Sequence, residues 1–226
     1  MKTKENLILL SISILLLLSF IIVVVIVYQC GGNLVLDNSI RDFFYSIRGQ
    51  KYGIIYWIFR VLTEFGDIYF IAILLVATLI YSKLDARWFI LFIGILLTTL
   101  FNRGVKELFS RQRPNEAMWW MEESSNSFPS GHSTSSGFMY PFIAYCAYKS
   151  DYSKKIKNIL YIVCASMLPI IMISRLVLGM HFFTDVIAGA LSGAVFSVLG
   201  MILLNYCIKN NILSEGLLSK IGNKGE

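Results

Sequence analysis

Long uncharged apolar runs are the feature that most constrains how this chain can fold. The first runs from Leu7 to Tyr28 without one charged side chain. A helix rises about 1.5 Å per residue, so about 20 apolar residues are enough to cross the hydrocarbon core of a bilayer. The composition agrees, because 56% of the 226 residues are hydrophobic and only 15% are charged. Both features indicate a membrane protein.

Six apolar segments have the length of membrane-spanning helices, some of them with the help of snorkelling flanks. We expect them at residues 7–28, 67–81, 88–101, 131–148, 159–173 and 182–206. The third segment is expected to continue as a helix to about Phe109. No internal repeat or low-complexity tract is visible. We therefore predict an all-α polytopic membrane protein in which residues 1–226 form one domain.

The first segment has an alternative interpretation as a signal peptide, because Lys2 and Lys4 precede it. Its apolar run is longer than a usual signal-peptide core, however, and no small-x-small cleavage site follows it. We interpret it as an uncleaved membrane helix.

The charge of the short loops predicts the orientation of these helices. The loop at residues 149–157 sets a single acidic residue against Lys149, Lys154, Lys155 and Lys157. Because cytoplasmic loops are enriched in Lys and Arg, this loop and both termini are expected to be cytoplasmic. The segments 29–66, 102–130 and 174–181 then lie outside. The second of these is also basic, and cations on the outer side suggest an anionic ligand.

The outer segment 29–66 has two amphipathic stretches. The first is expected to be a helix along the membrane interface, capped by Asp37 or Asn38 and with an apolar face made of Ile40, Phe43, Phe44 and Ile47. The second, Ile54–Leu62, is expected to pack across the outer ends of the bundle. A gate for the substrate is the alternative role of this second stretch.

Two cations follow the third predicted span, where Pro114 ends any helix. Lys106 and Arg113 are two helical turns apart and are therefore expected on one face. A guanidinium group can bind two oxygens at once and an ammonium group acts as a point charge, so the pair suits a tetrahedral phosphate. The alternatives are a solvated basic face or a contact with phospholipid headgroups.

The fourth predicted span begins at a Ser130-Gly131-His132 sequence. Backbone N–H groups in the first turn of a helix lack helical partners and attract anions. Gly131 allows a ligand to approach the backbone closely, Ser130 adds a hydroxyl group, and His132 lies within reach of what the amides hold. An ordinary capped turn is the alternative interpretation.

The connection between the last two spans contains Arg175, His181 and Asp185. On a helix, a carboxylate four residues after a histidine can accept a hydrogen bond from one ring nitrogen and leave the other free to attack. A surface pair or two metal ligands are alternatives. The neighbouring cations disfavour a metal, so we predict neither metal nor cofactor, and we interpret Glu122 and Glu123 as loop charge.

Together the three stretches resemble the three signature motifs of the type 2 phosphatidic acid phosphatase superfamily. These motifs are Lys, six residues and Arg-Pro; Pro-Ser-Gly-His; and Ser-Arg, five residues, His, three residues and Asp, and each is matched here. The surroundings resemble bacterial membrane members that act on phosphatidylglycerophosphate or undecaprenyl diphosphate. The resemblance implies a six-helix membrane bundle with functional residues Lys106, Arg113, Ser130, Gly131, His132, Ser174, Arg175, His181 and Asp185.

The expected function is therefore dephosphorylation of a membrane lipid at the outer face of a bacterial plasma membrane. His181, oriented by Asp185, would attack phosphorus and form a phosphohistidine, while His132 would protonate the departing lipid oxygen. Lys106, Arg113 and Arg175 would hold the phosphate oxygens without a metal. The expected partners are the lipid substrate and the bilayer. A nucleic acid is not expected, and the sequence does not say which protein partners the chain has.

Three other classes of protein remain as alternatives. A transporter or channel could use the histidines and the aspartate as a proton relay, but such groups would lie near the bilayer midplane and would not need outer cations. Vanadate-binding haloperoxidases resemble this superfamily in the same three motifs, but they are soluble. An inactive lipid-binding protein is the third alternative.

Overall fold

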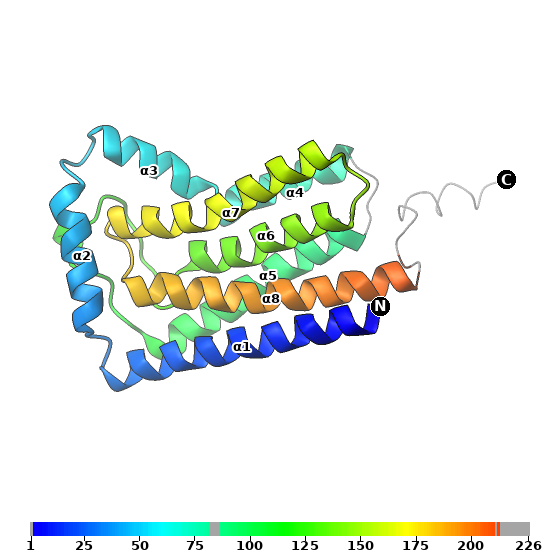
Figure 1. Ribbon diagram of the computed structural model, residues 1–226. Coiled ribbons are helices and arrows are strands. Elements are labelled where there is room, and N and C mark those ends of the chain that lie inside the picture. Colours follow the sequence, from blue (N-terminus) through cyan, green and yellow to red (C-terminus); the bar gives the residue numbers. More distant parts are fainter. Residues whose placement is uncertain (1, 82–85, 211, 213–226) are drawn as a thin grey trace.

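The computed structural model describes residues 2–81, 86–210 and 212, and within these residues it is helical without strands (Figure 1). The predicted all-α class is therefore confirmed for the described part of the chain. The expected single domain also includes residues 1, 82–85, 211 and 213–226, which lie outside the described residues. The helices are α1 Lys2–Gln29, α2 Val35–Ile47, α3 Ile54–Glu64, α4 Ile68–Tyr81, α5 Ala86–Phe109, α6 Gly131–Lys149, α7 Lys154–Val177 and α8 Phe183–Lys209, with a short 3-10 helix, η1, at Glu116–Met118.

The long helices lie alongside one another, and α2 crosses one end of this bundle (Figure 1). Four described helices, α1, α5, α7 and α8, have the length and hydropathy needed to cross a membrane. The helix α4 has 14 described residues, and the N-terminal half of α6 is rich in Ser, Thr and Gly. The six-span count therefore stays a prediction. As predicted, the helix of the third segment ends at Phe109.

Glycines on α8 allow its backbone to touch the backbone of α6. A Cβ atom at Gly193 would lie 2.2 Å from the Thr134 carbonyl oxygen, and one at Gly189 would lie 2.5 Å from the Ser130 carbonyl oxygen. Small residues at such contacts are typical of helix packing in membranes. The contact brings the start of α6 against the start of α8, where the Ser130 amide donates a hydrogen bond of 3.0 Å to the Asp185 carbonyl.

The two amphipathic stretches form helices, but the predicted cap of the first is wrong. Helix α2 begins at Val35, with Leu34 at the N-cap position. Asp37 lies inside the first turn and is 1% exposed, because its carboxylate accepts hydrogen bonds from Thr184 of α8 instead of from its own helix. Helix α3 packs Tyr56 against the end of α7 and Trp120. The position of both helices at the membrane interface stays a prediction.

The glycine contact gives a first testable prediction. Gly193→Ala should lower the melting temperature in detergent, because a methyl group would overlap a backbone carbonyl of α6 and force the helices apart, at a cost of about 1–3 kcal/mol. Gly104→Ala on α5 is the matched control, since nothing lies within 4 Å of its Cβ position. Equal melting temperatures for the two variants would contradict the packing.

Candidate active site

His181 lies in the turn between α7 and α8, not on a helix. Helix α7 ends at Val177, and Gly179 then adopts a φ of +76°, a conformation that favours glycine. The Met180 amide closes this turn with a 3.0 Å hydrogen bond to the Arg175 carbonyl. The expectation that His181 and Asp185 share a helical face is therefore wrong. Their side chains nevertheless meet, with His181 Nδ1 3.5 Å from Asp185 Oδ2.

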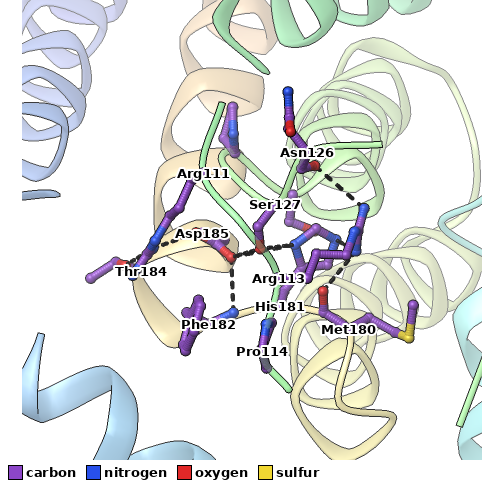
Figure 2. Close-up of polar contacts among 12 residues, drawn as sticks. Arg111, Arg113, Pro114, Asn126, Ser127, Met180, His181, Phe182, Thr184 and Asp185 are labelled. Carbon is purple, nitrogen blue, oxygen red and sulfur yellow. Dashed lines mark hydrogen bonds and ion pairs between the residues drawn. The ribbon is translucent and has the colours of Figure 1, made fainter. Parts of the chain in front are cut away.

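Asp185 is fully buried, and its two carboxylate oxygens have different partners (Figure 2). Oδ2 accepts hydrogen bonds from the Phe182 amide at 2.9 Å and from the Ser127 hydroxyl, and it is the oxygen that faces His181. Oδ1 accepts a hydrogen bond of 2.6 Å from Arg111 NH1. Neither Ser127 nor Arg111 was assigned a role from the sequence, because the contacts join segments far apart in the chain.

Lys106 and Arg113 come together through a loop, not along a helix. The chain leaves α5 after Phe109 and turns at Ser110, which has a φ of +45°, so the prediction of one shared helical face is wrong. Both side chains instead donate to the segment Ser125–Asn126. Lys106 Nζ contacts Ser125 Oγ at 3.3 Å and also the Asn126 carbonyl, and Arg113 NH2 contacts the same two groups at 3.1 and 3.4 Å.

Arg113 also reaches the ring of His181 (Figure 2). Its NH1 atom lies 2.7 Å from the Met180 carbonyl and 3.2 Å from His181 Nε2. A guanidinium group can only donate hydrogen bonds, so Nε2 is the acceptor and the ring proton lies on Nδ1, toward Asp185. This assignment leaves the Nε2 lone pair on the side of the cations.

The surroundings of His181 favour its neutral form. The side chain is 3% exposed. Burial, followed by the positive charges of Arg113, Lys106 and Arg175, holds the pKa of His181 well below its usual value of 6.5. The ring is therefore uncharged at neutral pH, which is the form that can act as a nucleophile.

Arg175 is a buried cation with an unused donor. It stands in the last turn of α7 and is 1% exposed. Its NH1 atom donates to Thr63 Oγ1 at 3.1 Å and lies 3.9 Å from the sulfur of Met121. Within the described residues its Nε has no hydrogen-bond partner. A buried donor without a partner is costly, so this N–H favours an acceptor such as a phosphate oxygen.

His132 lies in the first turn of α6 and lines a cavity of about 200 Å³. Gly131 lines the same cavity, and a Cβ there would meet Asn102 Oδ1 at an ordinary 3.6 Å, so packing alone does not require glycine. Ser130 is buried and caps α6, because its hydroxyl accepts hydrogen bonds from the Ser133 amide at 3.4 Å and hydroxyl at 3.1 Å. Its contribution to phosphate binding stays a prediction.

Ser174, which the family resemblance added to the expected site residues, donates its hydroxyl hydrogen to the Ile171 carbonyl of its own helix at 2.6 Å. The hydroxyl is buried, and a functional role for Ser174 stays a prediction.

Two carboxylates lie near the site although the sequence predicted no role there for either of them. Asp67 Oδ2 lies 3.5 Å from His132 Nε2. Glu123 lines the cavity of His132 and lies 3.8 Å from Arg113 NH2, so its interpretation as loop charge is wrong. Burial alone would raise the pKa of Glu123, but Arg113 and hydrogen bonds from Ser125 lower it below 4.5. In the described residues, no three His, Cys, Asp or Glu side chains are grouped to hold a metal.

Residues 87–209, more than half of the chain, match the family model of the PAP2 superfamily. The chain belongs to the PAP2 superfamily. Every motif residue from Lys106 to Asp185 lies inside the matched region, whereas Asp37, Thr63 and Asp67 lie outside it.

This PAP2 chain is similar to proteins that have been named and solved. Phosphatidylglycerophosphatase B of Bacillus subtilis (strain 168) is 43% identical over 91 residues, which are 40% of this chain and 44% of the relative. The match thus spans less than half of that relative. The crystal structure of a transmembrane PAP2-type phosphatidylglycerolphosphate phosphatase from Bacillus subtilis has a TM-score of 0.72 and 27% identity, covering 88% of this chain and 96% of that chain.

The crystal structure of Aquifex aeolicus LpxE has a TM-score of 0.59 and 23% identity, covering 75% of this chain and 96% of that chain. At that identity the likeness shows the fold alone. Together, the apolar helices and the likeness to a transmembrane structure show that this PAP2 chain is a membrane-embedded, multi-pass protein.

Proposed function

We propose that this protein is a lipid phosphatase whose substrate is phosphatidylglycerophosphate. The observation that carries the proposal is the buried Nε–H of Arg175, which lacks a partner among the described residues and belongs to a side chain whose charge acts on His181. Lys106 and Arg113 bring two further cations to the same histidine. Three cations around a neutral imidazole suit a phosphate ester that is attacked by nitrogen. The names of the relatives favour this substrate over undecaprenyl diphosphate.

The proposed first step is an in-line attack of His181 Nε2 on phosphorus. The N–P bond forms as the bond from phosphorus to the lipid oxygen breaks, and the imidazolium form of His132 donates a proton to that oxygen and becomes neutral. In the second step His132 takes a proton from water, whose oxygen attacks phosphorus, and the N–P bond breaks. The products are the dephosphorylated lipid, inorganic phosphate and the free histidine. Asp185 supports the imidazole through its Nδ1–H in both steps.

The cations have to exchange partners when the phosphate binds. Lys106 and Arg113 now donate to Ser125 and to the Asn126 carbonyl, which are neutral acceptors. Arg113 NH1 also donates to His181 Nε2, and this contact has to pass to the phosphate before Nε2 can attack. A phosphate dianion is a stronger acceptor, because charge-assisted hydrogen bonds are about twice as strong as neutral ones. The cations would then stabilise the charge on the equatorial oxygens, which a metal ion does in kinases. The proposed reaction accordingly needs no metal or cofactor.

The cation cluster also favours a phosphatase over a transporter with a proton relay. A relay through His181 would require its ring to take up a proton, and nearby permanent positive charge disfavours the protonated form. His181 instead lies 3.2 Å from the guanidinium of Arg113 and is held neutral. This environment suits a nucleophile better than a member of a proton relay.

We further propose that the chain forms one domain with six spans in a bacterial plasma membrane, with cytoplasmic termini and the site outside. The basic loop at residues 149–157 supports this orientation. In a Cys30→Ser background, a membrane-impermeant maleimide should label Ser124→Cys in intact cells, and Asp151→Cys only after permeabilisation. Both positions are exposed in loops at opposite ends of α6. The reverse labelling pattern would overturn the orientation.

The two histidines should have separable roles. Purified His181→Ala should release no phosphate and form no labelled phosphoenzyme, because the nucleophile is absent. His132→Ala should be slowed in forming or hydrolysing the phosphoenzyme, because the proton donor is absent. Phosphate release is measured in detergent micelles with phosphatidylglycerophosphate, undecaprenyl diphosphate and phosphatidate, with and without EDTA. Full activity in His181→Ala, or loss of parental activity in EDTA, would contradict the mechanism.

The free donor of Arg175 gives a more specific prediction. Arg175→Lys keeps the charge but removes Nε–H, so it should lower kcat/KM about 10–100-fold, the value of one hydrogen bond to a charged group. The matched control is Arg60→Lys on α3, whose side chain pairs with Glu64 at the surface and should retain parental kcat/KM. Parental kcat/KM in Arg175→Lys would remove the main support for the phosphate site.

A further inference from the structure

Arg111 is a buried cation that the proposed reaction does not use. Its side chain is 5% exposed and lies between two carboxylates, with NH1 2.6 Å from Asp185 Oδ1 and NH2 2.7 Å from Asp37 Oδ2. Both carboxylate side chains are almost fully buried, at 0% and 1% exposed respectively. A buried carboxylate is unfavourable without a positive partner, so one guanidinium stabilises both.

All five N–H groups of Arg111 have an acceptor. Nε and NH2 each donate to the Gly32 carbonyl, at 3.2 and 2.6 Å, and NH1 also donates to Thr184 Oγ1 at 2.8 Å. With the two carboxylates this makes five hydrogen bonds, which is the full capacity of a guanidinium group. Unlike Arg175, Arg111 has no donor left for a phosphate. Its role is therefore different from that of the three phosphate-binding cations.

Asp37 joins α2 directly to the start of α8. Besides its contact with Arg111, it accepts hydrogen bonds from the Thr184 amide at 2.9 Å and the Thr184 hydroxyl at 2.7 Å. Thr184 precedes Asp185 in the first turn of α8 (Figure 2). Asp37 therefore fixes the backbone next to Asp185 as well as the guanidinium that holds its side chain.

The other end of α2 is fixed to the end of α7. Arg48, which is buried, donates to the Val177 carbonyl at 3.1 Å and the Met118 carbonyl at 2.7 Å. Its guanidinium lies over the rings of Tyr45, at 4.0 Å, and Trp120, at 4.5 Å. Helix α2 thus bridges the turn that carries His181, with one contact on each side of it.

The contact with Arg111 also decides which way the Asp185 carboxylate is turned. Because Oδ1 is held by Arg111, Oδ2 is left to face the Phe182 amide, the Ser127 hydroxyl and His181 Nδ1. Turning the carboxylate out of this plane would break the contact with the guanidinium, whereas a half turn would only exchange two equivalent oxygens and restore it. The orientation of the imidazole therefore depends on a residue that never touches the substrate.

We propose that Arg111 and Asp37 are positioning residues for the reaction: Asp37 on α2 holds Arg111, and Arg111 holds Asp185 in the rotation that orients His181. The inference rests on the phosphatase function proposed above. It extends the site to α2, which lies outside the region that matches the family. A residue that acts through the nucleophile affects the chemical step, so its loss should lower kcat and leave KM unchanged.

The test compares substitutions of Arg111 and Asp37 with matched substitutions at the surface, using phosphatidylglycerophosphate in detergent micelles. Arg111→Gln should lower kcat about 100-fold, the size expected for a misplaced catalytic group, with parental KM. Arg111→Lys and Asp37→Asn should fall between this variant and the parent, because each keeps part of the contact. The controls are Arg103→Gln on α5 and Asp42→Asn on α2, both exposed, and each should retain parental kcat.

Chemical rescue separates positioning from folding. Arg111 lines an open cavity of about 620 Å³, so Arg111→Ala leaves a space that a guanidinium ion can reach. Millimolar guanidinium should restore part of the lost kcat in Arg111→Ala but none in His181→Ala. A purely structural loss would not respond to the added ion.

The outcomes distinguish this inference from the proposed function. An inactive parent would overturn both. An active parent with parental kcat in Arg111→Gln and Asp37→Asn overturns only the positioning role. A raised KM at parental kcat in Arg111→Gln would also overturn the positioning role, because it would identify Arg111 as a phosphate contact. If Arg111→Gln does not fold, the kcat of Asp37→Asn and the guanidinium rescue of Arg111→Ala are the deciding measurements. The inference is overturned if Asp37→Asn has parental kcat and guanidinium does not restore kcat in Arg111→Ala.

Discussion

The burial of Asp185 is the constraint on which the rest of the site depends. A carboxylate with no exposed surface is stable only when positive charge and hydrogen-bond donors surround it. The chain supplies Arg111 on one oxygen, and the Ser127 hydroxyl and the Phe182 amide on the other. These contacts come from the loop before α6, from the turn before α8 and, through Asp37, from α2. Satisfying one buried charge thus brings together the segments that form the site.

The cations near this carboxylate divide into two kinds. Arg111 has used its full hydrogen-bonding capacity on protein acceptors and two carboxylates. Arg175 has a donor without a partner in the described structure, while Lys106 and Arg113 donate to neutral groups of a loop. The first kind stabilises the fold around Asp185, and the second is available to an anion. Net charge alone would not separate them, because the difference lies in which acceptors each side chain already has.

The sequence predicted the long helices, and it failed where the argument needed contacts between distant segments. Apolar runs placed the long helices because hydrophobicity and length are local properties. Helical spacing, in contrast, was wrong for Lys106 and Arg113, since the chain leaves α5 at Phe109 and a loop brings the two side chains together. The interpretation of Glu123 as loop charge fails because its contact with Arg113 has no signature in the local sequence.

The amino-acid sequence alone was enough to predict a helical chain that is apolar enough for a membrane, with two histidines and several cations near the ends of its helices. Those properties depend on residue type and spacing along the chain. Contacts between distant segments were needed to show which cation holds Asp185 and which has a donor without a partner in the described residues. They also show that Asp37 binds the start of α8 instead of capping α2. Both depend on the close contact of α6 with α8 and on the position of α2 across the bundle, and these arise from packing.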